Sequence, residues 1–201
     1  IYNPDHKSEK ILHFILRENK LLHEILQFYL NDKWYRRLPE NEPNYILRAS
    51  IARSSGPNSL PLHIDSFIPS SGSEAFVMQV LFSLDESKIE NGSTVVVPKS
   101  HLRDRYASQD DMKHAIPLEL EQGDLAIWDS RLWHGANPNL TGEDRWSIIA
   151  TFTRWWIKQN YQTVNNLPQS FVDKLTPNEK TIMGFNSYPP LNEYERIDIK
   201  K

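Results

Sequence analysis

The sequence predicts a mainly β protein with helices at both ends. Three observations predict it: an amphipathic pattern near the N-terminus, a central region of short apolar runs separated by turn-forming residues, and a helix-capping pattern near the C-terminus. The short connections favour an antiparallel sandwich or barrel, because parallel strands would need a helix between each pair. We expect a single domain over residues 1–201.

The N-terminal segment predicts one or two helices over about residues 8–30. Apolar side chains recur there mostly every three or four residues, which is the period of an amphipathic helix. The chain begins with isoleucine, which is compatible with a missing N-terminal part.

The β core is predicted over about residues 44–156, where runs of aliphatic and β-branched residues alternate with turn signals. The predicted strands are YILRASIA, EAFVMQVLFSL, TVVVP, HAIPLEL, LAIWD and RWSIIATFTRWW. The predicted loops and turns are GPNSLP, ENGS and EQGD. A short helix is expected over about residues 177–184, because Thr176 and Glu179 have capping-box types and Pro177 suits the first helical position.

The composition limits the classes of function. Hydrophobic residues make up 39% and charged residues 24%, and the longest mostly apolar run, AFVMQVLF, is too short to span a membrane. The net charge is −3 with scattered lysines and arginines, which argues against nucleic acid and favours a small-molecule partner. No leader pattern is present, so we expect a cytoplasmic protein. We expect it to be a monomer or homodimer.

The stretch LPLHIDSFIPS, residues 60–70, places His63 and Asp65 two positions apart. Residues with this spacing project from the same face of a strand, so both side chains could bind one ion, although an ordinary polar pair is the alternative. The sequence has no cysteine, so any further ligand must be histidine or a carboxylate. His134, in GDLAIWDSRLWHGANPN, is the candidate, at a strand end beside a glycine. Two histidines and a carboxylate suit non-haem iron(II), with zinc as the rival ion.

Arg145 begins the last long run, RWSIIATFTRWW. An arginine directed into an apolar, aromatic-lined interior is costly without an anion, and its planar guanidinium suits bidentate capture of a carboxylate. A dicarboxylic co-substrate would supply that anion. Two other readings stay open: a cupin-like metal-dependent isomerase or hydrolase without such a co-substrate, and a non-catalytic β-sandwich binding protein.

The order of these motifs resembles the phytanoyl-CoA dioxygenase family of Fe(II)- and 2-oxoglutarate-dependent oxygenases. The resemblance rests on H-x-D, NGSTVVVPKSH, GDLAIWDSRLWHGA and R-x-S, and covers about residues 45–156. It implies a double-stranded β-helix, which is a cupin-like jelly roll. Lys99 stands where the family usually has glycine, which we expect to alter a turn and not the chemistry.

The resemblance also implies roles for individual residues. His63, Asp65 and His134 would bind Fe(II), Arg145 would bind the distal carboxylate of 2-oxoglutarate, and Ser147 would assist it. Dioxygen would be the second co-substrate. Related halogenases carry a small residue in place of the carboxylate, so Asp65 implies hydroxylation of an unactivated C–H bond, with release of succinate and carbon dioxide. We expect a small metabolite as the substrate.

Other candidates rest on position alone. Gln79 alternates with Val77 and Leu81, so it either contacts 2-oxoglutarate or substrate, or is a satisfied core amide. Candidate substrate-binding residues around the strand before H-x-D and around the second histidine are Arg48, Arg53, Trp128, Arg131 and Trp133.

Overall fold

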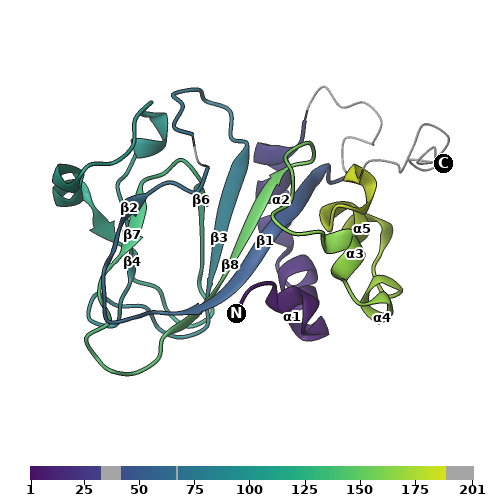
Figure 1. Ribbon diagram of the computed structural model, residues 1–201, viewed down its shortest axis with the longest axis horizontal. Coiled ribbons are helices and arrows are strands. Elements are labelled where there is room, and N and C mark those ends of the chain that lie inside the picture. The colour runs from purple at the N-terminus through teal and green to yellow at the C-terminus, as the bar shows by residue number, and fades with distance from the viewer. Residues whose placement is uncertain (33–41, 67, 189–201) are drawn as a thin grey trace. The chain divides into compact units, whose positions relative to one another are not determined.

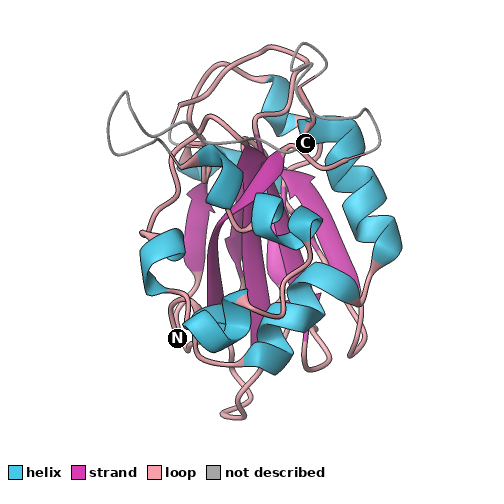
Figure 2. Ribbon diagram, turned by 90° about the vertical axis from the view of Figure 1, so that its right-hand side faces the viewer, coloured by secondary structure: helices cyan, strands magenta, loops and turns pink. Residues whose placement is uncertain are grey.

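The computed structural model describes residues 1–32, 42–66 and 68–188, and within them the strands form two four-stranded sheets. The strand orders are β1-β8-β3-β6 and β2-β7-β4-β5. The pairings β2–β7, β3–β6, β4–β5 and β4–β7 are all antiparallel. The strands, magenta in Figure 2, therefore confirm the predicted mainly β, antiparallel architecture.

The element bounds are as follows (Figure 1). The strands are β1 (Tyr45–Ser54), β2 (Leu60–His63), β3 (Val77–Ser83), β4 (Thr94–Val96), β5 (Ile116–Pro117), β6 (Leu125–Asp129), β7 (His134–Ala136) and β8 (Trp146–Arg154). The α-helices are α1 (Glu9–Arg17), α2 (Lys20–Leu30), α3 (Thr163–Asn166), α4 (Gln169–Val172) and α5 (Pro177–Ile182). The 3-10 helices are η1 (Pro4–His6), η2 (Ser100–Leu102), η3 (Gln109–His114) and η4 (Phe185–Ser187).

The chain divides into two units. One comprises Ile1 with Ile51–Ile149, and the other comprises Tyr2–Ser50 with Ala150–Lys201. Strands β1 and β8 run through the boundary, so each contributes residues to both units. The single domain over residues 1–201 stays a prediction.

The first unit contains β2 to β7. Every residue of β3 is buried, and its side chains are apolar except for Gln79 and Ser83. Such a run is typical of a strand that is covered on both faces. In the other sheet β4 is buried throughout, and Trp133, just before β7, has no exposed surface.

One turn of the first unit carries the departure from the family pattern. Lys99 precedes η2 with φ of 63° and ψ of 6°, which is the left-handed region. Side chains with a Cβ are disfavoured there and glycine is not. The backbone thus keeps a glycine-type conformation although the residue is lysine.

The second unit contains the predicted N-terminal helices. Ser8 and Asn19 cap α1 and α2 by accepting hydrogen bonds from the amides of Ile11 (3.4 Å) and Leu22 (2.8 Å). The apolar faces of both helices are buried at Leu12, Ile15, Leu16, Leu22, Leu26 and Leu30. These helices are amphipathic, as the periodicity predicts.

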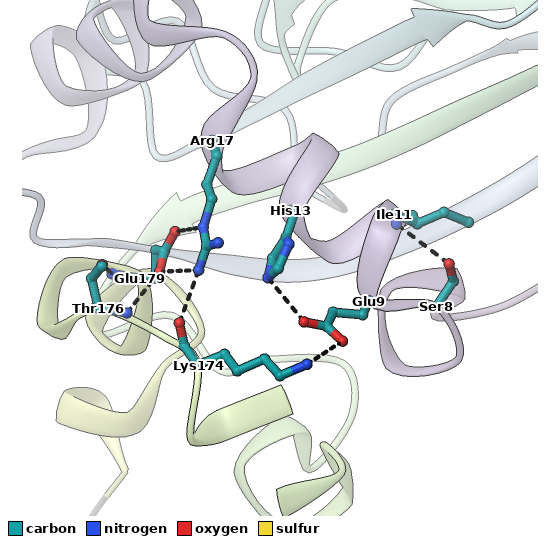
Figure 3. A network of polar contacts seen from close by, with 8 residues as sticks. All are labelled: Ser8, Glu9, Ile11, His13, Arg17, Lys174, Thr176 and Glu179. Atoms are coloured by element: carbon teal, nitrogen blue, oxygen red, sulfur yellow. Dashed lines mark hydrogen bonds and ion pairs between the residues drawn. The ribbon is translucent and has the colours of Figure 1, made fainter. Parts of the chain in front are cut away.

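A polar network ties α1 to the C-terminal helices of the same unit (Figure 3). Arg17 donates from Nε to Glu179 Oε1 and from Nη2 to Oε2 at 3.0 Å, and Nη2 also donates to the Lys174 carbonyl at 2.9 Å. Glu179 belongs to the capping box of α5, whose N-cap is Thr176. Glu179 therefore caps the N-terminus of α5 and also connects α5 to α1, which is far away in the sequence.

No helix among the residues that the structure describes combines the length and apolar character needed to cross a membrane. The predicted cytoplasmic location and the predicted oligomeric state stay predictions.

Candidate metal centre

His63 and His134 come together because β2 pairs with β7. The two residues are register partners across this antiparallel pair, and their ring centroids lie 4.2 Å apart. His63 ends β2 and His134 begins β7, beside Gly135 and after β6, so His134 lies at a strand end as predicted. Cross-strand partners have neighbouring side chains on one face of the sheet, which brings the two imidazoles to one place.

Backbone carbonyl groups orient both histidine rings. His63 Nδ1 is 2.9 Å from the Pro61 carbonyl oxygen, and His134 Nδ1 is 2.9 Å from the Leu132 carbonyl oxygen. A carbonyl oxygen only accepts, so each Nδ1 carries the proton and donates. Nε2 is then the ring nitrogen of each histidine that can bind a metal ion, which is the usual arrangement of metal-binding histidines.

Asp65 lies against both Nε2 atoms. Its Oδ1 is 3.7 Å from His63 Nε2, and its Oδ2 is 3.2 Å from His134 Nε2. The backbone amide of Asp65 donates to the Ser130 carbonyl at 2.9 Å, and Gln79 Nε2 donates to Asp65 Oδ2 at 2.7 Å. The carboxylate is thus fixed both through its main chain and through its side chain.

These three residues have the geometry of a metal site. One ligand atom from each of His63, Asp65 and His134 lies within 4.8 Å of the other two. Two ligands that bind one ion at about 2.1 Å are roughly 3 to 3.5 Å apart, so the measured separations fit a shared ion with small adjustment. Two histidines and one carboxylate suit Fe(II) and Zn(II).

The exposure of the three side chains shows where the centre opens. His134 is 9% exposed, whereas His63 is 37% and Asp65 is 33% exposed. The side of the centre at His63 and Asp65 is therefore open to solvent, and the His134 side is closed. A small molecule would approach from the His63 side.

The electrostatics of the centre favour the forms that bind metal. Burial and the neighbouring charge of His134 lower the pKa of His63 below its ordinary value, which favours the neutral ring. Burial raises the pKa of Asp65, but the hydrogen bond and charge of His134, with smaller contributions from His63 and Gln79, hold it below its ordinary value. Asp65 is accordingly a carboxylate at neutral pH.

A glycine lets the two metal-binding strands approach each other. A Cβ at Gly135, next to His134 on β7, would lie 2.4 Å from the carbonyl oxygen of Leu60 on β2. No real Cβ makes so short a contact with backbone, so any other residue here would push β7 away from β2. Gly135 is thus required by the same strand pairing that brings the histidines together.

Arg145 is a buried cation that has hydrogen-bonding capacity to spare. It is 5% exposed and immediately precedes β8. Nη2 donates to the Gly92 carbonyl, while Nε is buried and has no hydrogen-bond partner among the described residues. Burial, then repulsion from Arg53, lowers the pKa of Arg145, and Asp85 opposes this effect. A bound anion would satisfy Nε and offset the desolvation of the charge.

Ser147 shares the setting of Arg145. It is 4% exposed and lies on β8, two residues after Arg145. In an extended chain residues two apart leave the same face, so the hydroxyl and the guanidinium project to the same side.

Two of the predicted substrate-binding residues are engaged elsewhere. Arg131 is 4% exposed and forms a buried ion pair with Asp129, 2.7 Å from Nη2 to Oδ2, while Nη1 donates to Ser70 and Gly72. Trp133 has no exposed surface, and the guanidinium groups of Arg103 and Arg105 lie 4.9 and 4.4 Å from its ring centroid. Both positions hold loops in place.

The other three candidates differ in location. Trp128 lies on β6 with its ring centroid 5.4 Å from that of His134. Arg53 is exposed, and its charge acts on both His63 and Arg145. Arg48 belongs to the second unit, where its Nε is 3.4 Å from the Lys158 carbonyl.

Sequence reasoning missed the residues that orient the ligands. Gln79 is a buried amide with a hydrogen-bond partner, as one predicted alternative had it, but the sequence did not reveal that this partner is the Asp65 carboxylate. The carbonyls of Pro61 and Leu132 position the histidines, and no side-chain pattern could reveal them because every residue has a carbonyl. The equal spacing of two residues between each carbonyl and its histidine becomes visible only in the structure.

Taken together, a double antiparallel sheet and a two-histidine, one-carboxylate centre define a jelly-roll protein with a metal site of the non-haem iron type. Residues 3–147 match the family described as phytanoyl-CoA dioxygenase (PhyH), and the chain belongs to this family. The predicted family is thereby confirmed.

The chain is also similar to individual proteins. The chain is 32% identical over 127 residues to an uncharacterised protein of Mycobacterium tuberculosis, a match that covers 62% of this chain and 46% of that protein. It is 27% identical over 146 residues to the dioxygenase af480 of Aspergillus fumigatus, covering 69% of this chain and 46% of the relative. The chain therefore spans about half the length of these curated relatives.

Solved structures support the fold. HygX from Streptomyces hygroscopicus, determined with nickel and 2-oxoglutarate bound, superposes with a TM-score of 0.60 at 16% identity, covering 79% of this chain and 70% of that chain. EvdMO1 superposes with a TM-score of 0.57 at 23% identity, covering 76% of this chain and 34% of that chain. These likenesses confirm the jelly-roll fold class.

Proposed function

We propose that the protein is an Fe(II)- and 2-oxoglutarate-dependent dioxygenase that hydroxylates a C–H bond of a small molecule. The observation that carries the proposal is the convergence of His63, Asp65 and His134, with both Nδ1 atoms held by carbonyls and both Nε2 atoms within 3.7 Å of the Asp65 carboxylate. Membership of the phytanoyl-CoA dioxygenase family supports it. The structure of HygX with 2-oxoglutarate bound provides a precedent for that co-substrate in the fold.

The three ligands would hold iron from one side and leave the remaining coordination positions open. When bound, iron supplies the activation of dioxygen that couples oxidation of 2-oxoglutarate to succinate and carbon dioxide with hydroxylation of the substrate. The chain orients the two imidazoles through Pro61 and Leu132 and fixes the carboxylate through Gln79. This preorganisation keeps the ligand geometry constant while co-substrate and substrate enter.

Arg145 would bind the distal carboxylate of 2-oxoglutarate, and Ser147 would assist it. The support is that Arg145 Nε is buried without a partner and that no carboxylate of the described residues forms an ion pair with this guanidinium. A dicarboxylic 2-oxo acid provides such an anion at one end and a chelating group at the other. An isomerase or hydrolase that uses the same triad would need a different anion to pair with Arg145.

The experiment is an anaerobic titration of the metal-free protein with Fe(II) and then 2-oxoglutarate, followed by the visible charge-transfer absorption of the chelate. We expect the band in the wild type, and Arg145→Ala should need roughly 10- to 100-fold more 2-oxoglutarate, because hydrogen bonds to a charged group are lost. Arg154→Ala, on the same strand but in the second unit, serves as the matched control.

The metal ligands are tested in the same way. His134→Ala should abolish the band, whereas His114→Ala, which removes an exposed histidine of η3, should leave it unchanged. A wild-type protein that binds Fe(II) but gives no band with saturating 2-oxoglutarate would favour the isomerase or hydrolase. A wild-type protein that binds no metal would favour the non-catalytic binding protein.

A further inference from the structure

Trp128 provides a hydrogen-bond donor beside the metal centre that the residues of the chain leave unused. Trp128 is 8% exposed, and its Nε1 is buried without a hydrogen-bond partner among the described residues. Indole nitrogen only donates, so an acceptor has to come from elsewhere. Buried donors in folded proteins are almost always paired, which makes this one informative.

The strand register shows which way Trp128 faces. Trp128 on β6 is the direct partner of Gln79 on β3, so both side chains leave the same face of this strand pair. Gln79 reaches the Asp65 carboxylate from that face. Trp128 consequently faces the metal centre.

The contact with His134 places the indole at the closed side of the centre. The two ring centroids are 5.4 Å apart and the ring planes are inclined by 58°. His134 uses Nδ1 for the Leu132 carbonyl, and its Nε2 faces Asp65. Neither the histidine nor the carboxylate accepts a hydrogen bond from the indole N–H.

Resting on the proposed function, we infer that Trp128 is a positioning residue whose Nε1–H donates a hydrogen bond to an oxygen of the metal-bound end of the 2-oxo acid co-substrate. This gives the co-substrate a polar contact at each end, with Arg145 at the distal carboxylate. Water cannot take this role in the free protein without a path to Nε1, which has essentially no exposed surface. The contact therefore requires the side chains that cover Nε1 to shift when the co-substrate binds.

The test compares wild type, Trp128→Phe and Trp156→Phe. Phenylalanine keeps an aromatic ring against His134 and removes only the N–H, and Trp156 is 51% exposed and belongs to the second unit. In the anaerobic titration we expect Trp128→Phe to bind Fe(II) as tightly as the wild type does. Its affinity for 2-oxoglutarate should be about 10-fold weaker, with a displaced absorption maximum, because one hydrogen bond to a carboxylate is lost.

A second readout follows the indole proton directly. Nitrogen-15 correlation spectra of the zinc-loaded protein resolve the tryptophan side-chain N–H signals, and the signal missing from Trp128→Phe identifies Trp128. Adding 2-oxoglutarate should move this signal downfield more than that of Trp156, since a hydrogen bond forms at this N–H.

The outcomes separate this inference from the function it rests on. A wild-type protein without any response to 2-oxoglutarate overturns both. A normal wild-type response, with unchanged 2-oxoglutarate affinity and band position in Trp128→Phe and an unmoved indole signal, overturns the role of Trp128 alone. Loss of Fe(II) binding in Trp128→Phe would show that the indole supports the fold of the centre and not the co-substrate.

Discussion

His63 and His134 are directly opposite one another on the antiparallel strands β2 and β7, with imidazole centroids 4.2 Å apart. The pairing of β2 with β7 therefore brings the two histidines of the metal centre together. Asp65, two residues after His63, supplies the third ligand. Anything that shifts the pairing of β2 with β7 should separate the histidines, and this dependence can be tested without touching a ligand.

Gly135→Ala should damage the centre through the backbone. The new Cβ would meet the Leu60 carbonyl oxygen at 2.4 Å, so β2 and β7 must move apart. We expect a loss of roughly 2–3 kcal/mol in unfolding free energy, as for overpacked sites, together with weaker Fe(II) binding. Urea denaturation and metal titration measure the two effects. Gly56→Ala, which has no atom within 4 Å of the new Cβ, is the control and should change neither quantity appreciably.

Gln79→Leu should weaken metal binding while the ligands remain. The substitution removes the amide that donates to Asp65 Oδ2 at 2.7 Å, so the carboxylate loses its orientation. Loss of such a supporting contact typically costs about 10- to 100-fold in metal affinity. Competition with a chelator measures the Fe(II) dissociation constant. Gln122→Leu, at an exposed position whose amide donates to the Leu84 carbonyl, is the control. Equal affinities in all three proteins would show that Gln79 has no such role.

Lys99→Gly should stabilise the fold. Lys99 is exposed and has a φ of 63°, a conformation that costs a residue with a Cβ about 1–2 kcal/mol. Glycine removes this cost, but its greater chain entropy in the unfolded state cancels about 0.5–1 kcal/mol of the stabilisation. We expect a net increase of roughly 0.5–1 kcal/mol in unfolding free energy and no change in Fe(II) affinity. Lys113→Gly, in η3, should lower stability instead. A lower denaturation midpoint for Lys99→Gly would contradict the argument.

Glu179→Gln should destabilise the second unit in a pH-dependent way (Figure 3). Burial raises the pKa of Glu179, but the hydrogen bonds from Arg17 and Thr176 outweigh it and hold the pKa below its ordinary value. The stabilisation by the carboxylate is thus fully present above the ordinary pKa and is lost as pH falls through the lowered pKa of the folded state. We expect a difference of about 1–2 kcal/mol at pH 7, reduced by solvent at the partly exposed Arg17.

The measurement for this pair is the unfolding free energy of wild type and Glu179→Gln between pH 7 and pH 3. The difference should be constant from pH 7 to about pH 5 and should shrink below about pH 4.5, since Glu179 becomes protonated there. Glu24→Gln, at the exposed Lys20–Glu24 pair of α2, should show almost no difference at any pH. A difference for Glu179→Gln that does not depend on pH would indicate lost packing and not lost charge.

The sequence by itself determined the local features of this protein. Capping residues such as Ser8 and Thr176 act on amides three residues away, so these features depend on neighbours in the chain. Residue type also limited the chemistry, since a chain without cysteine can bind a metal only through histidine and carboxylate.

Only the tertiary structure decided which of these residues meet. The short strands β2 and β7 were not predicted, because strands of three or four residues that contain Pro61 or Gly135 have little local strand preference and form by pairing with each other. That pairing places His134 opposite His63, and the β3–β6 register places Gln79 and Trp128 on the face toward Asp65. The register of distant strands depends on burial and hydrogen bonding across the whole sheet, which the local spacing of residues in a sequence does not contain.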